Sequence, residues 1–221
     1  MNFFTRVLRT ASLPIESTVV VSGLGRCGTT LVYNAVIGSS LRYKDARGFA
    51  VDLNSVPFKN SYVYKTHDYP PDRLPTWVKV IFMFGNPMDA AISSEKAFRG
   101  LNHYTHVKSP YASQHDRIFE KDVLLMEEHF DRWMRPQSFP FLSIRYEDLY
   151  SKSVRETLST YVGSAVRFPE KKMRGSDWQS HPARDKLQST YRSLAEKVRL
   201  APSVKLWPSK DAAPREEGIA G

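Results

Sequence analysis

The stretch Thr18–Thr30, with the sequence TVVVSGLGRCGTT, constrains the fold more than any other part of this chain. Its uninterrupted apolar run, Val19–Val21, is typical of a strand that is buried on both faces, as in a parallel sheet covered by helices. Three glycines follow, and they let the backbone turn sharply because no Cβ stands in the way. We expect a helix over Leu31–Ile37, whose N-terminal N–H groups and dipole would favour an anion.

The spacing of this loop matches the P-loop of nucleoside triphosphate enzymes except at one position. Gly23 and Gly28 are separated by four residues, but Thr29 stands where the P-loop has its lysine. Because that lysine contacts the β- and γ-phosphates, its absence argues against ATP or GTP hydrolysis and against most kinases. The cation comes three residues earlier instead, at Arg26.

The segment GRCGTT resembles the 5′-phosphate loop of sulfotransferases that use 3′-phosphoadenosine 5′-phosphosulfate, with a cysteine in place of the usual serine. The resemblance implies that this loop binds the 5′ end of the donor nucleotide. The residues implied are Gly25, Arg26, Cys27, Gly28, Thr29 and Thr30.

Other apolar runs alternate with stretches of helical spacing along the chain. The expected strands are Tyr62–Thr66, Lys79–Phe84, Phe141–Arg145 and a shorter one near Leu41–Lys44. The expected helices are Ala90–Phe98, Asp116–Met134, Ser153–Val162 and Arg184–Arg199. Such alternation indicates an α/β fold, a three-layer sandwich with a central parallel sheet like that of P-loop nucleotide-binding proteins. Ligands of these sheets gather at the carboxyl ends of the strands.

The strand that begins at Tyr62 ends in Lys65, Thr66 and His67. By itself, a histidine after a strand is more often a loop residue than a catalytic base. Lys-Thr-His before a proline-containing turn, however, resembles the sulfotransferase segment whose histidine takes the proton from the acceptor hydroxyl. The resemblance implies that His67 is the general base, while Arg26 and Lys65 stabilise the leaving phosphate oxygen. A carboxylate base, Glu147, is the alternative.

Asn86 and Pro87 are explained as the N-cap and the first residue of a helix. Asp89, at the third helical position, can accept a hydrogen bond from the backbone N–H of the N-cap. The resembling family reads Arg-x-Pro-x-Asp here, with a serine four residues on, and the arginine and serine hold the 3′-phosphate. Ser93 fits this pattern, but Gly85 occupies the arginine position. An arginine–phosphate pair is worth roughly 1.5–3 kcal/mol per charged hydrogen bond, so another cation has to compensate. The candidates are Lys79, Arg99 and the Arg167–Arg174 cluster.

The segment Arg145–Leu149, RYEDL, also resembles a family motif, in which the tyrosine lies near the adenine. Tyr146 is therefore implied as a nucleotide contact, and Phe168 as a stacking face where Leu31 replaces a family tryptophan. The two acids of the motif, Glu147 and Asp148, are expected to cap the following helix.

A basic segment, Lys171–Trp178, resembles the loop that closes over the 3′-phosphate in cytosolic sulfotransferases. Arg174 and Gly175 fit that loop best. The alternative interpretation is a flexible basic loop without a ligand. Between Arg167 and Arg199 there are nine Lys or Arg residues against four acids, and the whole chain carries +9, which favours anionic partners.

The length of 221 residues suits one domain, expected over residues 1–207, with a disordered tail over 208–221. A single cysteine excludes an internal disulfide and favours a reducing, cytoplasmic location. No apolar stretch approaches the roughly 18 residues of a membrane span, so no transmembrane segment is expected. The segment Met1–Pro14 is interpreted as a short surface helix, which leaves peripheral membrane contact open.

Together these motifs predict a sulfotransferase that moves a sulfuryl group from 3′-phosphoadenosine 5′-phosphosulfate to a small-molecule or carbohydrate acceptor. No metal is expected, since His103 and His106 lack a nearby cysteine or clustered carboxylate. The segment Phe98–Phe119 is expected to contribute to the acceptor pocket. We expect no nucleic acid partner, because the aromatic-basic strands of RNA readers are missing. The alternatives are a nucleotide- or nucleic-acid-binding protein without catalysis and a P-loop kinase.

Overall fold

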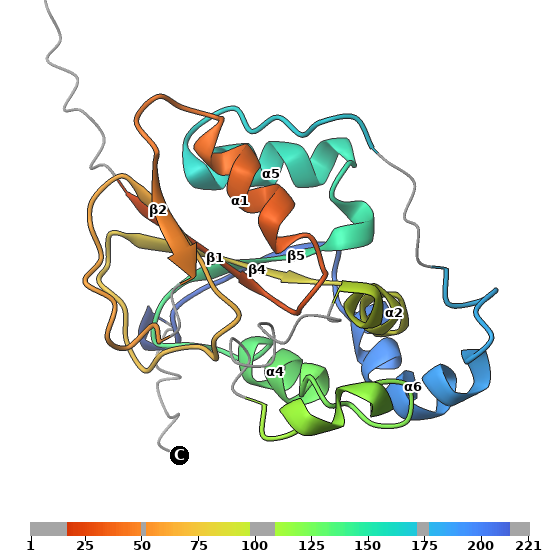
Figure 1. The fold of residues 1–221 in the computed structure, drawn as a ribbon. Helices are drawn as coiled ribbons and strands as arrows, with labels where there is room; N and C mark the ends of the chain where they lie inside the picture. The colour runs from red at the N-terminus through yellow and green to blue at the C-terminus, as the bar shows by residue number, and fades with distance from the viewer. Residues whose placement is uncertain (1–16, 50–51, 98–108, 172–176, 213–221) are drawn as a thin grey trace, which may run out of the picture.

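A six-stranded sheet with the order β2-β3-β1-β4-β5-β6 runs through the middle of the molecule (Figure 1). The computed structural model describes residues 17–49, 52–97, 109–171 and 177–212. The first five strands are parallel, whereas β6 pairs with β5 in the antiparallel sense. The strands are β1 (Thr18–Gly23), β2 (Lys44–Phe49), β3 (Tyr62–Lys65), β4 (Val78–Phe84), β5 (Phe141–Arg145) and β6 (Val204–Trp207).

Helices cover both faces of the sheet, as Figure 1 shows. Val19 and Val21 of β1 are buried in a cluster that includes apolar residues of α1 and α5, whereas Val20 belongs to a second cluster with residues of α2, α4 and α6. The helices are α1 (Thr29–Ile37), α2 (Pro87–Ala97), α4 (Met126–Trp133), α5 (Lys152–Val162) and α6 (Arg184–Leu200). The expected α/β class with three layers is thus confirmed.

The predicted helix Asp116–Met134 is wrong over its first half. A 3-10 turn, Ala112–Arg117, is followed by irregular chain, and α4 begins only at Met126. The reason lies in α6, because the hydroxyl of Tyr191 donates to the carbonyl of Ile118 at 2.7 Å. The hydroxyl of Thr190 donates in the same way to the carbonyl of Phe119 at 2.9 Å. Side chains from a distant helix thus take carbonyls that an α-helix would use internally.

Both edges of the sheet also differ from the expectation. β2 begins at Lys44, where the predicted strand Leu41–Lys44 ends, and Leu41 is fully exposed. β6 was not expected, and it is held by stacking of Trp207 on Phe141 with ring centroids 5.4 Å apart. A 3-10 turn, Lys210–Ala212, opens the segment assigned to the tail. Residues 213–221 of that tail and the expected N-terminal helix lie outside the described residues.

Candidate functional site

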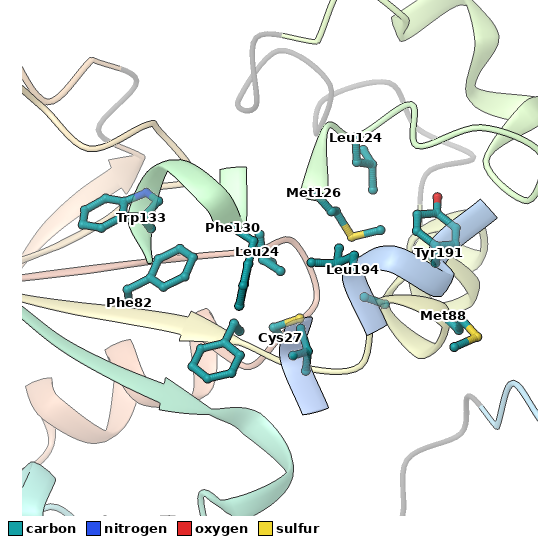
Figure 2. Packing of buried hydrophobic residues seen from close by; sticks show 14 of the residues in the cluster. Leu24, Cys27, Phe82, Met88, Leu124, Met126, Phe130, Trp133, Tyr191 and Leu194 are labelled. Carbon is teal, nitrogen blue, oxygen red and sulfur yellow. The ribbon is translucent and has the colours of Figure 1, made fainter. Parts of the chain in front are cut away.

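The glycine loop after β1 is anchored in the core by two of its own side chains. Leu24 and Cys27 are fully buried, in the same cluster as Phe82, Phe130 and Leu194 (Figure 2). The N–H of Leu24 donates to the carbonyl of Met83 on β4 at 2.9 Å. Because its side chain lies in the core, Cys27 can contact a nucleotide only through its backbone.

The loop ends in a conformation that presents backbone to a ligand. Arg26 and Gly28 both have positive φ, at 63° and 83°, and Gly28 is the N-cap of α1 without a side-chain capping bond. Thr29 is 3% exposed, and among the described residues its hydroxyl makes no hydrogen bond. A helix N-terminus beside a buried hydroxyl without a partner is the arrangement that an anion would complete.

Arg26 and Ser93 meet across the loop, as their joint assignment to the nucleotide requires. The Nε of Arg26 donates to the Oγ of Ser93 at 3.0 Å. Ser93 lies on α2, which follows β4, so the contact depends on β4 being the neighbour of β1. The two residues are 67 positions apart in the chain, and no local pattern indicates the contact.

Lys65 reaches the same loop from β3. Its Nζ donates to the hydroxyl of Thr30 at 3.2 Å and lies 5.7 Å from the centre of the Tyr33 ring. The Tyr33 hydroxyl donates to Asp45 of β2. Burial lowers the pKa of Lys65, and the charge of Asp45 opposes this shift. The sequence analysis did not identify Tyr33 and Asp45 as neighbours of Lys65. Helical spacing could have indicated Tyr33, since it lies one turn after Thr30 on the same face of the helix.

His67 lies two residues after the end of β3 and is 7% exposed. Its Nδ1 lies 2.6 Å from the carbonyl oxygen of Gly23. Since a carbonyl only accepts, Nδ1 must carry the hydrogen, and this hydrogen bond assigns Nε2 as the acceptor of the neutral ring. That tautomer is the one a general base at Nε2 requires.

Asp68 fixes the backbone next to His67. Its carboxylate accepts from the N–H of Leu53 at 2.9 Å, and its carbonyl accepts from Nε2 of His129 at 2.8 Å. Burial is the main cause that lowers the pKa of His129 to about 4, so this imidazole is neutral near pH 7. His129 thereby links α4 to the end of β3, a link that no pattern in the sequence indicates.

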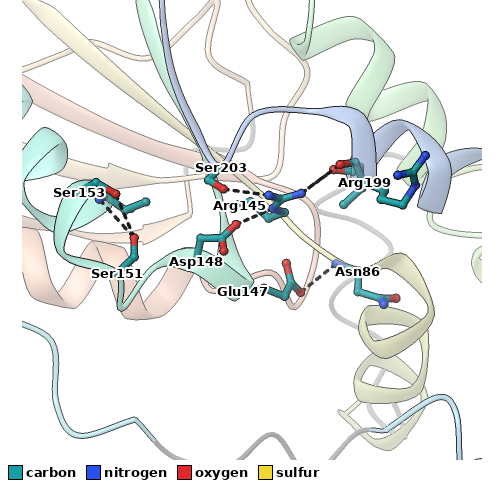
Figure 3. A network of polar contacts seen from close by, with 10 residues as sticks. Asn86, Arg145, Glu147, Asp148, Ser151, Ser153, Arg199 and Ser203 are labelled. Atoms are coloured by element: carbon teal, nitrogen blue, oxygen red, sulfur yellow. Dashed lines mark hydrogen bonds and ion pairs between the residues drawn. The ribbon is translucent and has the colours of Figure 1, made fainter.

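The ends of β4 and β5 form the other side of the site (Figure 3). Tyr146 packs on Gly28, since a Cβ placed there would lie 2.4 Å from its ring. The carboxylate of Glu147 accepts from the N–H of Asn86 at 3.0 Å, and that of Asp148 accepts from Nε of Arg145 at 2.6 Å. The prediction that the two acids cap α5 is therefore wrong.

The caps of α2 and α5 are made by other side chains. Oδ1 of Asn86 accepts from the N–H of Met88 at 3.0 Å, which confirms Asn86 as the N-cap of α2. The hydroxyl of Ser151 caps α5 by accepting from Val154. Oδ1 of Asp89 accepts from the N–H of Trp178 at 3.0 Å, so its observed bond ties α2 to the chain before α6 instead of returning to the cap.

Lys79, one of the candidate cations for the position of Gly85, is not supported. Lys79 is paired with Val19, four residues before the pair Gly23 and Met83 at which the loop begins. At about 3.3 Å per residue it lies about 13 Å from the loop, near the opposite end of the strand. Its Nζ is 6.0 Å from the Tyr161 ring instead.

Among the remaining candidates, some are described by the structure and others lie outside the described residues. Phe168, the expected stacking face, lies beside Tyr150 with ring centroids 5.7 Å apart. In the acceptor segment Phe98–Phe119, the described part includes Tyr111, whose ring lies 3.4 Å from Nζ of Lys121. The candidates outside the described residues are Arg99, His103, His106, Arg174 and Gly175.

No helix in the described part of the chain is long and apolar enough to cross a membrane. Within the same residues, no group of three or more His, Cys, Asp or Glu side chains is placed to hold a metal ion. The groups that converge between the glycine loop and the end of β3 are cations, hydroxyls and one imidazole. They suit an anionic ligand and a proton transfer.

No protein-family model matches the chain, and no curated protein matches its sequence. Among solved structures, it is similar to retinol dehydratase in complex with androsterone and the inactive cofactor PAP (19% identity, TM-score 0.42). It is also similar to mouse sulfotransferase SULT7A1 complexed with PAP (14% identity, TM-score 0.42). The matches cover 83% and 85% of this chain, but only 64% and 66% of those chains. The likeness concerns the arrangement of the chain and carries no statement about activity.

Proposed function

We propose that this protein transfers a sulfuryl group from a nucleotide 5′-phosphosulfate to a hydroxyl of a small-molecule or carbohydrate acceptor. 3′-Phosphoadenosine 5′-phosphosulfate is the donor that the sequence resemblance implies. The observation that carries the proposal is the convergence of Arg26, Lys65 and His67 at the glycine loop. These residues come from two neighbouring strand ends, so their convergence adds a spatial argument to the sequence motifs.

The nucleotide's 5′-phosphate would occupy the N-terminus of α1. There the first-turn N–H groups and the buried hydroxyl of Thr29 would donate to its oxygens. The guanidinium of Arg26 and the ammonium of Lys65 would neutralise the charge that develops on the phosphate oxygen as it leaves the sulfur. The contacts of Arg26 with Ser93 and of Lys65 with Thr30 support this proposal, because cations that are held beforehand stabilise a developing charge without reorganisation.

In the transfer step, the acceptor oxygen forms a bond to sulfur while the bond between sulfur and the 5′-phosphate oxygen breaks. The electron pair of the broken bond stays on the phosphate, and the acceptor proton passes to Nε2 of His67. The carbonyl of Gly23 holds the opposite ring nitrogen, so the imidazole is oriented before the acceptor binds. By analogy with phosphoryl transfer, positioning and charge neutralisation are the protein's contribution.

The proposal is tested with His67→Asn, whose side-chain amide can still donate to the Gly23 carbonyl but has no group in the place of Nε2. We expect sulfate transfer from labelled donor to fall about 10²- to 10⁴-fold, while binding of the desulfated nucleotide, adenosine 5′-monophosphate or adenosine 3′,5′-bisphosphate, is retained. His181→Asn, which changes a histidine beside Phe119, is the control.

Full activity of His67→Asn would remove His67 from its role and favour Glu147 as the base. Phosphoryl transfer from Mg-ATP without sulfate transfer would favour the kinase alternative. Nucleotide binding without transfer to any acceptor would favour the non-catalytic one.

A further inference from the structure

The order of the strands determines in which direction a bound nucleotide extends. β1, which carries the glycine loop, has β3 on one side and β4, then β5, on the other. Lys65 and His67 lie on the β3 side, so the sulfur and the acceptor belong there. With the sulfur on the β3 side, a nucleoside that lies along the strand ends would extend over β4 and β5, which lie about 5 and 10 Å from β1 at the usual strand spacing.

At the ends of β4 and β5, a carboxylate lies against a glycine. A Cβ built on Gly85 would come within 3.0 and 3.1 Å of the two carboxylate oxygens of Glu147. The same carboxylate accepts from the N–H of Asn86, the next residue. At the position of Gly85, the sequence resemblance leads one to expect an arginine that binds the 3′-phosphate. The chain instead has the carboxylate of Glu147 beside this position.

A cavity of about 260 Å³ opens beside this carboxylate, in the region drawn in Figure 3. Pockets that enclose a whole drug-sized ligand have roughly 300–1,000 Å³, so this one suits a part of a ligand, such as a sugar ring. Its walls are formed by Asn86, Pro87, Arg145, Glu147, Asp148, Ala195, Val198 and Arg199.

The two guanidinium groups on the cavity wall are engaged in the protein itself. Arg145 donates to Asp148, to Ser203 and to the carbonyls of Val198 and Arg199. This set of bonds connects β5 to the C-terminal end of α6. The guanidinium of Arg199 donates twice to Glu196. A phosphate in the cavity would have to compete with these bonds and would face the carboxylate of Glu147.

We propose that this cavity receives the ribose of the nucleotide with its 3′-hydroxyl unphosphorylated, and that Glu147 determines this specificity by accepting a hydrogen bond from that hydroxyl. A carboxylate accepts strongly from hydroxyl groups, whereas it repels a phosphate. Gly85 contributes because it has no Cβ, which lets the carboxylate of Glu147 lie against the backbone at this point. The inference rests on the proposed function, and its ligand class is the adenosine 5′-phosphates and 5′-phosphosulfates with a free 3′-hydroxyl.

The test compares adenosine 5′-monophosphate with adenosine 3′,5′-bisphosphate in calorimetric titrations of the full chain. We expect the monophosphate to bind at least as tightly as the bisphosphate, and tighter binding of the bisphosphate would overturn the inference. 3′-Deoxyadenosine 5′-monophosphate should bind about tenfold more weakly than adenosine 5′-monophosphate, because it lacks the hydroxyl that donates to Glu147.

The variant Glu147→Gln keeps an oxygen for the N–H of Asn86 and removes the charge. It should raise the affinity for the bisphosphate relative to the monophosphate about tenfold. Glu156→Gln, which makes the same charge change on the exposed surface of α5, should leave this ratio unchanged. An unchanged ratio in Glu147→Gln would contradict the assigned role of Glu147.

The failure of this inference is distinguishable from that of the proposed function. If neither nucleotide binds, the nucleotide site itself is wrong, and the inference falls with it. If the bisphosphate binds more tightly while His67→Asn still abolishes sulfate transfer, the proposed function stands and only the assignment of the cavity is wrong.

Discussion

The two sides of the glycine loop carry different charges and are held in different ways. On the β3 side lie the ammonium of Lys65 and the imidazole of His67, and a buried neutral histidine, His129, holds the backbone beside them. On the β5 side lie the carboxylates of Glu147 and Asp148, and the latter is paired with a guanidinium. Under the proposed function, this difference would separate charge neutralisation and proton transfer on the β3 side from recognition of the nucleoside on the β5 side.

The anchors on the two sides respond to acid at different pH values. Burial raises the pKa of Asp148, but the hydrogen bond and charge of Arg145 outweigh it and leave that pKa below its usual value. The stabilisation from this depressed carboxyl is complete above its unfolded pKa and is lost as the pH falls through the folded one. Because burial lowers the pKa of His129, the free energy of unfolding begins to fall at a higher pH on this side, as the pH drops below 6.5.

The largest expected effect compares two lysines on parallel strands. Both Lys65 and Lys79 lie near a tyrosine ring, and burial lowers the pKa of each, but only Lys65 is at the loop end of its strand. Lys65→Met should lower kcat for sulfate transfer about 10²- to 10³-fold, because it removes a cation from the leaving oxygen. Lys79→Met is the control and should stay close to the parent rate. Equal losses in both variants would contradict the assignment of chemistry to the β3 side.

A second prediction concerns the pH dependence of the β3-side anchor. Between pH 6.5 and about 4 the unfolded imidazole of His129 binds a proton that the folded one does not, so the free energy of unfolding falls as the pH falls. The loss should reach about 3 kcal/mol across this window. Urea unfolding at several pH values measures it, and His129→Gln should abolish most of that slope. His181→Gln, a histidine outside the core, should keep it.

The smallest expected effect concerns the β5 side. Gly28 and Gly163 have similar positive φ values, 83° and 77°, but only a Cβ on Gly28 would meet the Tyr146 ring. Gly163→Ala should lower the free energy of unfolding by about 1 kcal/mol, and Gly28→Ala by about 2 kcal/mol or more. Their difference in urea unfolding isolates the contact between loop and tyrosine. If the two losses are equal, the β5 side is not coupled to the loop.

Much of the site was predictable because its parts are local in sequence. The strand, glycine loop and helix from Thr18 to Ile37 form as expected, since apolar runs and glycines act over a few residues. The positions of Lys65 and His67 followed from the rule that parallel strands end at one edge. The first half of the predicted helix Asp116–Met134 failed because Tyr191 and Thr190 of a distant helix take its carbonyls.

The sequence by itself determined the alternation of β1 to β5 with helices along the chain, the glycine loop and the set of polar residues at the strand ends, because these depend on period, turn chemistry and residue type. Only the tertiary structure decided which residues meet. The bond from Arg26 to Ser93, the orientation of His67 by Gly23 and the carboxylate of Glu147 against Gly85 depend on which strands are neighbours. Strand order is fixed by burial of both faces of the sheet over the whole chain, and no short stretch carries that information.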